Sequence, residues 1–365
     1  MSQVSSMQPV LAARDLGVSY GNRKVLEIPE IDVIPNRVLA LIGPNGSGKT
    51  TLLLCLALLL KPTSGKILYR GETVLDGSKT LQLRRRFAVA FQEPLLLNTT
   101  VRENVRLGLR LRGFDSAEIK RRTDYWLEKF GIASLAERNA RTLSGGEAQR
   151  ASLARAFALQ PEVLFLDEPF AALDSPTRQS LFGDMVNILQ ETRFTTVLVT
   201  HDRNEAQTLA HRIVMLVNGK IVQSGTPREI FSSPVNEEVA RFVGIENVIE
   251  GKIVANRNGV VDIQVNGSII EGISGAQIGE LVDICIRPEH ITLSPVRSST
   301  SARNVFAGKI TSLLAAGALV RVSLDCGFPL VALITRLSAD ELNLEVGKQV
   351  FASFKATAIH VISVK

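Results

Sequence analysis

The chain has 365 residues, of which 45% are hydrophobic and 21% charged, and its formal net charge is +6. This balance excludes a disordered or fibrous chain and suits a globular protein with two or three domains. Three widely spaced cysteines lie in apolar stretches, and the four histidines are scattered. The sequence therefore predicts neither a disulfide framework nor a metal cage made of protein ligands alone.

Membrane insertion is also excluded by the sequence pattern. The longest uninterrupted apolar run, 52–60, has nine residues, whereas about twenty are needed to cross a bilayer. The segment 1–9 lacks the apolar core of a secretory signal. We expect a cytosolic protein that reaches a membrane only through a partner. The positive charge fits anionic partners, and it fits an ordinary solvated surface equally well.

Two patterns follow one another along the chain. Short apolar strands alternate with long helical segments up to residue 243, which predicts an α/β domain with a largely parallel sheet. Strands are expected at 38–42, 87–91, 163–166, 196–200 and 213–217, and helices at 50–60, 116–130, 146–159, 175–191 and 204–210. From residue 244 onward, β-rich runs at 260–265, 281–286, 319–324 and 350–354 predict a small all-β barrel of the OB type.

The second domain, predicted at 244–365, contains an internal repeat. The segment 247–253 (Asn-Val-Ile-Glu-Gly-Lys-Ile) resembles 304–310 (Asn-Val-Phe-Ala-Gly-Lys-Ile), and a block beginning at Gly279 resembles one beginning at Gly347. Two matched blocks in the same order favour duplication over chance, with copies at 245–297 and 301–365. The second copy is longer, which predicts an extra loop around 333–344.

The strongest local motif is a glycine-rich loop between a predicted strand and a predicted helix. Its glycines allow successive backbone N–H groups to turn toward phosphate oxygens, and the following helix directs its positive dipole end at the same anion. Lys49 would bind the outer phosphates and the Thr50 hydroxyl a magnesium ion. The motif consists of Gly43, Pro44, Asn45, Gly46, Ser47, Gly48, Lys49 and Thr50.

Polar side chains follow three other predicted strands. Asp167 and Glu168 end the apolar run 163–166, His201 follows 196–200, and Gln92 follows 87–91. Carboxyl ends of parallel strands share one sheet edge. Asp167 and Gln92 would therefore bind magnesium, while Glu168, His201 and Gln92 orient the water that attacks a phosphate. The alternative is a solvated or helix-capping acidic pair and a structural histidine.

A second motif, Leu143-Ser144-Gly145-Gly146-Glu147, completes a resemblance to the ATP-binding subunits of ABC transporters. Ser144 and Glu147 also form an S-x-x-E capping box, and a capped helix N-terminus is itself an anion site. The resemblance covers residues 10–243. It implies hydrolysis of MgATP, a helical subdomain at about 93–160 within domain 1–243, and a homodimer in which this motif contacts ATP bound by the other subunit.

The resemblance also implies roles for further residues. Tyr20 would stack on adenine, although an aromatic residue before Gly21 also suits a simple turn. Asp174 would belong to the loop between the acidic strand and the next helix, and Thr51 would join the nucleotide contacts. Ser144, Gly145 and Gly146 would complete the composite site. Transmembrane permease subunits and a solute-binding protein are the implied partners. The permease would hold this subunit at the cytoplasmic face of the membrane.

The tail resembles the duplicated OB-like accessory domain of import ATPases, and its second half resembles a molybdate- or tungstate-binding module. Hydroxyl, amide and cationic side chains suit a tetrahedral dianion. The alternative is that these residues only cap turns of a barrel used for dimer contact. The candidate oxyanion ligands are Ser301, Arg303, Asn304, Thr335, Ser338 and Lys355.

The sequence thus favours an importer ATPase for molybdate or tungstate, whose uptake would be slowed when the oxyanion binds the tail. An importer ATPase for sulfate, iron, polyamine or sugar remains the alternative, because the ATPase half and the segment Arg287–His290 suit all of them. A soluble protein acting on nucleic acid or ribosomes would need tandem cassettes or a coiled-coil insertion, which this chain lacks. We therefore expect no nucleic-acid partner.

Overall fold

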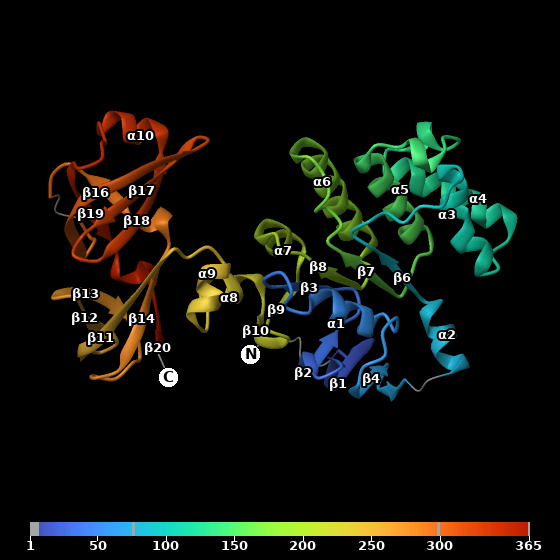
Figure 1. The fold of residues 1–365 in the computed structure, drawn as a ribbon, viewed down its shortest axis with the longest axis horizontal. Helices are drawn as coiled ribbons and strands as arrows, with labels where there is room; N and C mark the ends of the chain where they lie inside the picture. Colours follow the sequence, from blue (N-terminus) through green and yellow to red (C-terminus); the bar gives the residue numbers. More distant parts are fainter. Residues whose placement is uncertain (1–6, 75–76, 298–299, 364–365) are drawn as a thin grey trace. The chain divides into compact units, whose positions relative to one another are not determined.

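The computed structural model describes residues 7–74, 77–297 and 300–363, and it divides the chain into two compact units, Met1–Pro227 and Arg228–Lys365 (Figure 1). This division falls earlier than the boundary predicted at 243/244. Apart from Pro227, helices α8 (Pro227–Ser232) and α9 (Glu237–Phe242) lie in the second unit, whose side chains bind one carbonyl of α8 and one carbonyl between the two helices. Arg287 donates to the Phe231 carbonyl at 2.5 Å, and the His360 ring lies 2.9 Å from the Pro234 carbonyl.

The first unit is built on a ten-stranded sheet with the order β5-β4-β1-β2-β10-β9-β3-β8-β7-β6. The strands β6, β7, β8, β3 and β9 are parallel neighbours, as predicted. Because β3, β7 and β8 are buried along their whole length, they consist of nearly continuous apolar residues. The bounds of the five strands are β3 Val38–Ile42, β6 Phe87–Ala90, β7 Val163–Asp167, β8 Thr196–Val199 and β9 Arg212–Val217.

The other half of this sheet was not predicted. It is largely antiparallel and begins with a long hairpin of β1 and β2. Apolar and polar residues alternate irregularly in these strands, since the register shifts between Val18 and Ser19 and the pattern loses its period of two. The five strands are β1 Leu11–Tyr20, β2 Arg23–Val33, β4 Ser64–Tyr69, β5 Glu72–Thr73 and β10 Lys220–Gly225.

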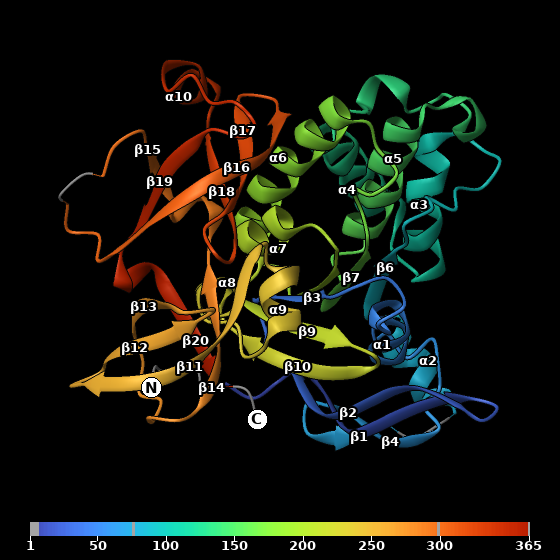
Figure 2. The same ribbon diagram turned by 60° about the vertical axis from the view of Figure 1, so that its left-hand side comes forward.

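Helices α3, α4 and α5 gather beyond β6, at the opposite end of the sheet from the antiparallel strands (Figures 1 and 2). They lie within the predicted subdomain 93–160. Thr100 and Asp115 cap α3 and α4 by accepting hydrogen bonds from backbone N–H groups. The helices of this unit are α1 Lys49–Leu56, α2 Ser78–Arg84, α3 Val101–Leu111, α4 Ser116–Lys129, α5 Gly145–Ala158, α6 Ser175–Thr192 and α7 Arg203–Leu209.

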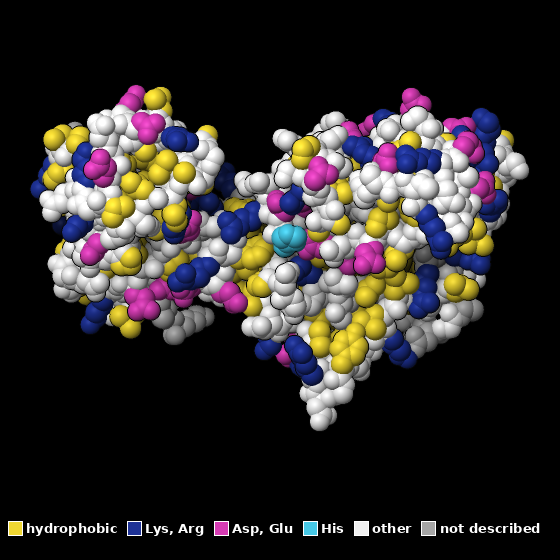
Figure 3. Space-filling view, turned by 45° about the horizontal axis from the view of Figure 1, so that its top comes forward, with side chains coloured by type: hydrophobic (Ala, Val, Ile, Leu, Met, Phe, Trp, Pro, Cys, Tyr) yellow, Lys and Arg dark blue, Asp and Glu magenta, His cyan; other side chains and the backbone are white. Residues whose placement is uncertain are grey.

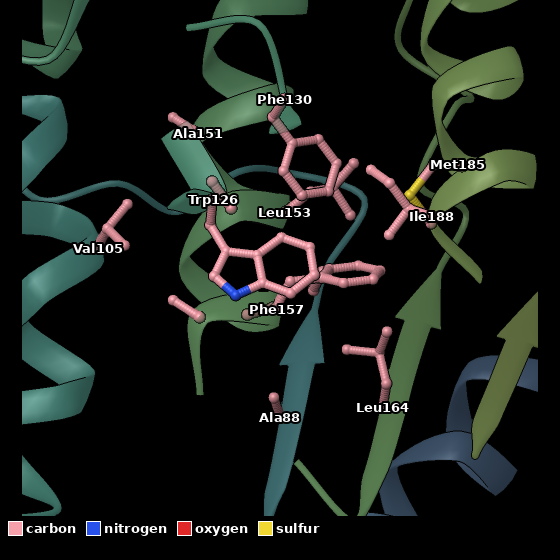
Figure 4. Packing of buried hydrophobic residues seen from close by; sticks show 14 of the residues in the cluster. Ala88, Val105, Trp126, Phe130, Ala151, Leu153, Phe157, Leu164, Met185 and Ile188 are labelled. Atoms are coloured by element: carbon pink, nitrogen blue, oxygen red, sulfur yellow. The ribbon is translucent and has the colours of Figure 1, made fainter. Parts of the chain in front are cut away.

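An aromatic cluster joins α4 to α5 (Figure 4). The Trp126 ring packs 5.2 Å from Phe157 and 6.1 Å from Phe130, measured between ring centroids. Trp126 is 2% exposed, and its Nε1 has no hydrogen-bond partner among the described residues. Its contribution to stability therefore comes from packing and burial rather than from a polar contact.

The second unit contains two five-stranded sheets, β13-β12-β11-β14-β20 and β15-β19-β16-β17-β18. They confirm the predicted all-β, OB-like region. Alternating buried residues, as in Val261, Ile263 and Val265 of β12, point into a shared core. The strands are β11 Asn247–Arg257, β12 Val260–Val265, β13 Ser268–Ile273, β14 Leu281–Ile286, β15 Thr292–Ser294, β16 Asn304–Ala316, β17 Leu319–Asp325, β18 Pro329–Thr335, β19 Gln349–Phe354 and β20 Ile359–Ser363.

The two repeats exchange their last strands. The strand β15, from the first repeat, pairs with β19 of the second, and β20, from the second repeat, pairs with β14 of the first. The extra residues of the second copy do not form the predicted loop. They extend β18 and form helix α10 (Arg336–Glu341), which is capped by the Thr335 hydroxyl because a threonine at this position accepts from the Ser338 N–H.

Two equivalent asparagines fasten each repeat to the other. Asn247 accepts from the Val331 N–H at 2.6 Å and donates to the Val331 carbonyl at 2.9 Å. Asn304 does the same with Glu271, at 2.8 Å for both bonds. Both side chains are buried. Each side-chain amide therefore satisfies a backbone N–H and a backbone C=O that would otherwise need water as a hydrogen-bond partner. These paired contacts explain why the sequence repeat begins with asparagine in both copies.

Truncation of the buried indole is expected to be costly. Trp126→Ala should lower the free energy of unfolding by about 3–5 kcal/mol, whereas Trp126→Phe, which loses no hydrogen bond, should cost much less. Guanidinium unfolding followed by far-ultraviolet circular dichroism measures both. Tyr125→Phe, at an exposed neighbour that packs on the indole edge, is the control. Equal losses for the Ala and Phe variants would show that the cluster does not depend on ring packing.

The hydrogen bonds between the Asn304 side chain and the Glu271 backbone give a second prediction. Asn304→Ala leaves the Glu271 N–H and C=O unpaired and should destabilise the second unit by about 2–4 kcal/mol. Asn266→Gly, which removes one exposed 3.3 Å contact at a position whose φ of 44° glycine also adopts, serves as the control and should change stability by less than about 1 kcal/mol. Hydrogen exchange at the Glu271 amide measures the loss of stability locally. Unchanged protection of this amide would contradict a stabilising role for the Asn304 contact.

Candidate functional site

Several predicted site residues of the first unit lie at the carboxyl edge of three adjacent strands. Leu41 of β3 and Asp167 of β7 both pair with Val199 of β8. The loops that leave these strands carry the glycine-rich segment, Glu168 and His201. Because the strands are parallel and neighbouring, the three loops lie side by side at the edge where ligands bind in open α/β sheets.

The loop between β3 and α1 is shaped by two glycines with positive φ, where a side chain would be strained. Gly43 has φ 145°, and a Cβ there would lie 2.0 Å from the Leu216 carbonyl oxygen. Gly48 has φ 97°, and its Cβ would lie 2.5 Å from Leu26 Cδ2. Both residues therefore lack room for a side chain and adopt backbone angles unfavourable to L residues. The loop curves closely against β2 and β9 as a result.

The side chains of this loop suit a phosphate group. Lys49 is buried, and its Nζ donates to the Gly43 and Pro44 carbonyls at 2.9 Å each. Burial lowers the Lys49 pKa, and the nearby carboxylates of Glu168 and Asp167 oppose that effect. The buried Ser47 Oγ has no partner in the described part of the chain. An enclosed ammonium, an unpaired hydroxyl and the first N–H groups of α1 form an anion cradle.

Asp167 and Thr50 provide oxygen atoms next to this cradle. Thr50 Oγ1 donates to Asp167 Oδ1 at 3.1 Å, across the gap between α1 and β7. Burial raises the Asp167 pKa, which the Thr50 hydrogen bond opposes. A buried carboxylate beside a hydroxyl is a donor set that suits Mg²⁺, a hard cation bound by oxygen ligands together with substrate phosphates. Within 7–74, 77–297 and 300–363, no group of three or more His, Cys, Asp or Glu residues could hold a metal by itself.

Glu168 leaves the strand in a strained conformation. Its φ is 47°, in the left-handed region that a non-glycine residue adopts only when its surroundings impose it. Its N–H donates to the Val199 carbonyl at 3.0 Å, which fixes the turn against β8. Glu168 Oε2 then lies 2.7 Å from His201 Nδ1. The structure thus brings together the predicted carboxylate and histidine, and the sequence pattern did not reveal the strained backbone.

Gln92 lies at the same edge, two residues beyond Ala90, which pairs with Leu166. Its side chain is exposed. The segment that follows is fastened to the helices by two residues that the sequence analysis missed. Arg155 donates to the Pro94 and Leu95 carbonyls at 3.0 Å each, and buried Asn104 bonds both the N–H and the carbonyl of Leu97. Their signal was a charged and a polar residue on otherwise apolar helix faces.

The second motif lies at the N-terminus of α5. Ser144 caps this helix through a complete capping box with Glu147, whose carboxylate accepts from the Ser144 N–H at 2.8 Å. Gly146 packs against Thr177, and a Cβ there would lie 2.4 Å from its methyl group. Ser144 and Gly145 are exposed. These two residues are therefore accessible from outside the single chain.

Asp174 and Tyr20 occupy exposed positions. Asp174 caps α6 by accepting from the Thr177 N–H at 3.1 Å, and this backbone bond lowers its pKa. Tyr20 ends β1 at the tip of the β1–β2 hairpin and is 57% exposed. The same hairpin carries Leu26, which contacts Gly48 of the glycine-rich loop. An exposed aromatic ring therefore lies on an element that touches the anion cradle.

The six candidate oxyanion ligands do not converge within one chain, contrary to the expectation of one site. Asn304 is buried and bonded to Glu271, and it pairs with Phe354, the neighbour of Lys355. Thr335 pairs with Leu319 instead, at the opposite end of β16. The cause is the length of β16, which separates the two groups. At one end lie Ser301, Arg303, Asn304 and Lys355, and at the other lie Thr335 and Ser338.

Thr335 and Ser338 line a cavity of about 480 Å³. Their hydroxyls bond each other at 2.8 Å. The other lining residues are mostly apolar, with the carboxylates of Glu289 and Glu341, so this cavity disfavours a dianion. Arg303 lies 3.6 Å from Glu271 through its Nε. Lys355, which is also exposed, follows Phe354, the register partner of Asn304.

Surface features agree with the composition. On the face shown in Figure 3, Lys and Arg side chains are interspersed with Asp and Glu over both units. The net positive charge is thus spread over solvated surface on this face. In the portion of the chain that the structure describes, no helix is long and apolar enough to cross a membrane.

Comparison with known proteins supports these observations. Residues 26–171 match the family model "ABC transporter", and residues 300–361 match the "TOBE domain". A molybdate/tungstate import ATP-binding protein of Pyrococcus horikoshii is 39% identical over 96% of this chain and 99% of its own length. A spermidine/putrescine import ATP-binding protein of Acetivibrio thermocellus is 35% identical over 84% of this chain and 85% of its own.

A sulfate/thiosulfate import ATP-binding protein of Thermosynechococcus vestitus is 33% identical over 93% of this chain and 95% of its own. Among solved structures, cbiO1 of Clostridium perfringens, part of an ABC transporter complex, aligns with a TM-score of 0.57 and 28% identity over 66% of this chain and 96% of its own. The ATP-binding cassette MJ0796, solved as a dimer with ADP and Pi, aligns with a TM-score of 0.55 and 28% identity. The alignment covers 60% of this chain and 99% of the MJ0796 chain. This chain belongs to the family of ABC transporter ATP-binding proteins and hydrolyses ATP.

Proposed function

We propose that this ATPase drives import of molybdate or tungstate. The observation that carries the proposal is the similarity to the molybdate/tungstate import protein of Pyrococcus horikoshii, which extends over nearly the whole of both chains and so includes the second unit. A second such protein, from Pyrococcus abyssi, is 38% identical over 96% of this chain. Relatives named for other solutes are less similar, at 31–35%.

ATP binds the loop between β3 and α1. Lys49 turns from the Gly43 and Pro44 carbonyls to the outer phosphates, and the backbone N–H groups of 46–51 surround the phosphate oxygens. Tyr20 stacks on the adenine ring. Thr50, Asp167 and Gln92 would hold Mg²⁺, which would supply positive charge to neutralise the phosphates. The support for the cation site is the 3.1 Å contact between Thr50 and the buried Asp167.

Hydrolysis requires a water molecule held in line with the γ-phosphate. Glu168 polarises that water and His201 orients it, supported by their 2.7 Å contact and by the backbone that turns Glu168 toward β8. Gln92 contributes from the neighbouring strand end. Since the carboxylate and imidazole fix each other, they can hold one water molecule in a defined position for attack.

The composite site forms in a homodimer. Ser144 and Gly145 are exposed at a capped helix N-terminus, beside the half-buried Gly146, and such a terminus is an anion site. These residues and the Asp174 loop contact ATP bound by the second copy. The solved dimer of MJ0796 with ADP and Pi supports this arrangement. Transmembrane permease subunits hold the dimer at the cytoplasmic face of the membrane, and a solute-binding protein delivers the anion.

The second unit senses the imported anion. Arg303 and Lys355 are exposed cations at one end of β16, near the exposed Ser301. Because Asn304 is committed to Glu271, and Thr335 and Ser338 lie at the other end, the anion is held by fewer groups than the sequence suggested. This separation is the observation that favours the second candidate function, import of another solute such as sulfate or a polyamine, with a tail that only supports dimerisation.

The catalytic assignment gives a direct prediction. Glu168→Gln should lower the kcat for ATP by about 10²-fold or more, because the amide no longer polarises water, and should leave ATP affinity nearly unchanged. Steady-state phosphate release and fluorescent-nucleotide binding measure the two effects. Glu191→Gln, at an exposed ion pair on α6, is the matched control and should behave as wild type. A Glu168→Gln variant with full activity would refute the assignment.

The substrate assignment gives a further prediction. The ATPase activity of the full chain assembled with its membrane subunits should fall when molybdate or tungstate is added, and sulfate should have no effect. Lys355→Ala should abolish the response, since it removes an exposed cation from the anion site. Lys309→Ala, which removes a lysine at a later position of β16, is the control. Indifference to all three anions would favour import of another solute.

A further inference from the structure

A buried carboxylate close to the hydrolytic site has no part in the roles described above. Glu205 lies on α7 and is only 5% exposed. Burial raises its pKa, and hydrogen bonds from Thr200 and Arg178 oppose that rise. A glutamate is almost never buried in this way unless it is paired. Its partners therefore indicate what it does.

Each oxygen of this carboxylate binds a different element. Oε2 accepts from the Thr200 hydroxyl, which follows β8, and Oε1 accepts from Arg178 Nη2 at 2.7 Å. The same Arg178 nitrogen lies 2.7 Å from Asp202 Oδ2. The Thr200 hydroxyl also accepts from the Asp202 N–H at 3.0 Å. Arg178 and Glu205 thus hold two residues, Thr200 and Asp202, in a closed network.

These two residues flank His201 on both sides. The His201 side chain itself is 51% exposed, so packing around its ring does little to fix it. Its backbone is fixed instead by its neighbours. Thr200 donates its N–H to the Leu41 carbonyl at 3.2 Å, and Asp202 caps α7. The direction in which His201 leaves the chain, and hence its 2.7 Å contact with Glu168, depends on this network.

Arg178 connects the network to a second loop. It lies in the first turns of α6 and donates its N–H to the carbonyl of Asp174, the residue that caps this helix. The same end of α6 contacts the glycine motif, because Thr177 packs against Gly146. A displacement at the start of α6 is therefore transmitted to Thr200 and Asp202 through one guanidinium.

Stability alone gives a weak account of this arrangement. A buried ion pair loses in desolvation much of what it gains in attraction, and apolar residues of similar size stabilise a core as well. Charged hydrogen bonds do impose direction, since a guanidinium and a carboxylate accept few alternative geometries. The network suits a role in orientation.

We propose that Arg178 and Glu205 are a positioning pair that fixes His201 against Glu168 and couples that geometry to the Asp174 end of α6. The inference rests on the roles proposed above for His201 and Glu168. Neither member of the pair is among the residues assigned above to nucleotide or Mg²⁺ binding. Both act through Thr200 and Asp202, so their loss should impair hydrolysis while leaving nucleotide binding intact.

The test uses the full-length chain and compares kcat with nucleotide affinity. Glu205→Gln and Thr200→Val should each lower kcat about tenfold, with the dissociation constant for a fluorescent ATP analogue within about twofold of wild type. Thr200→Ser, which keeps the hydroxyl, should retain activity. The double variant Arg178→Gln/Glu205→Gln should be no worse than the more damaging single variant, because the two residues act as a unit.

Two reference variants separate the possible failures. Glu191→Gln breaks the Lys129–Glu191 ion pair at the other end of α6 and should keep wild-type kcat. Glu168→Gln reports on the hydrolytic assignment itself. If Glu168→Gln is inactive but Glu205→Gln matches Glu191→Gln, the positioning pair is refuted and the proposed function stands. If Glu168→Gln is active, the proposed site is refuted. Equal loss in Thr200→Ser and Thr200→Val would also overturn the pair.

Discussion

The parallel pairing of β3, β8 and β7 is the constraint on which the ATPase unit depends. Adjacent parallel strands deliver their carboxyl ends to one edge, so residues far apart in sequence meet there without any special contact between them. Lys49, Asp167 and His201 occupy that edge because Asp167 ends one buried strand of this trio and the other two residues follow its neighbours. At this rim of an apolar sheet, burial lowers the pKa of Lys49 and raises that of Asp167, and a bound anion or cation would compensate.

The surrounding structure fixes this edge from several directions. Gly43 and Gly48 let the glycine-rich loop press against β9 and β2, while Arg155 and Asn104 fasten the segment after Gln92 to the helices. Each anchor uses a side chain to satisfy backbone groups that would otherwise lack partners in an irregular loop. The site loops are thus irregular in conformation and still held in place.

The second unit obtains its order from duplication. Exchange of β15 and β20 gives each sheet a strand from the other copy, and Asn247 and Asn304 repeat the same amide contact in both directions. Buried polar contacts of this kind tolerate few alternative arrangements. The repeat therefore specifies a paired module, in which an asparagine first interpreted as an anion ligand has a structural role.

Local residue patterns were sufficient to predict several elements of this protein from the sequence alone. The buried strands of the parallel sheet, the glycine-rich loop and the capping box of Ser144 were predictable, because a run of apolar residues or a spaced pair of polar ones specifies them directly. Features that depend on contacts between residues distant in the sequence became known only from the tertiary structure. The β1–β2 hairpin, the left-handed backbone of Glu168, the Arg178–Glu205 pair and the separation of Asn304 from Thr335 all follow from strand order and register, which no local pattern contains.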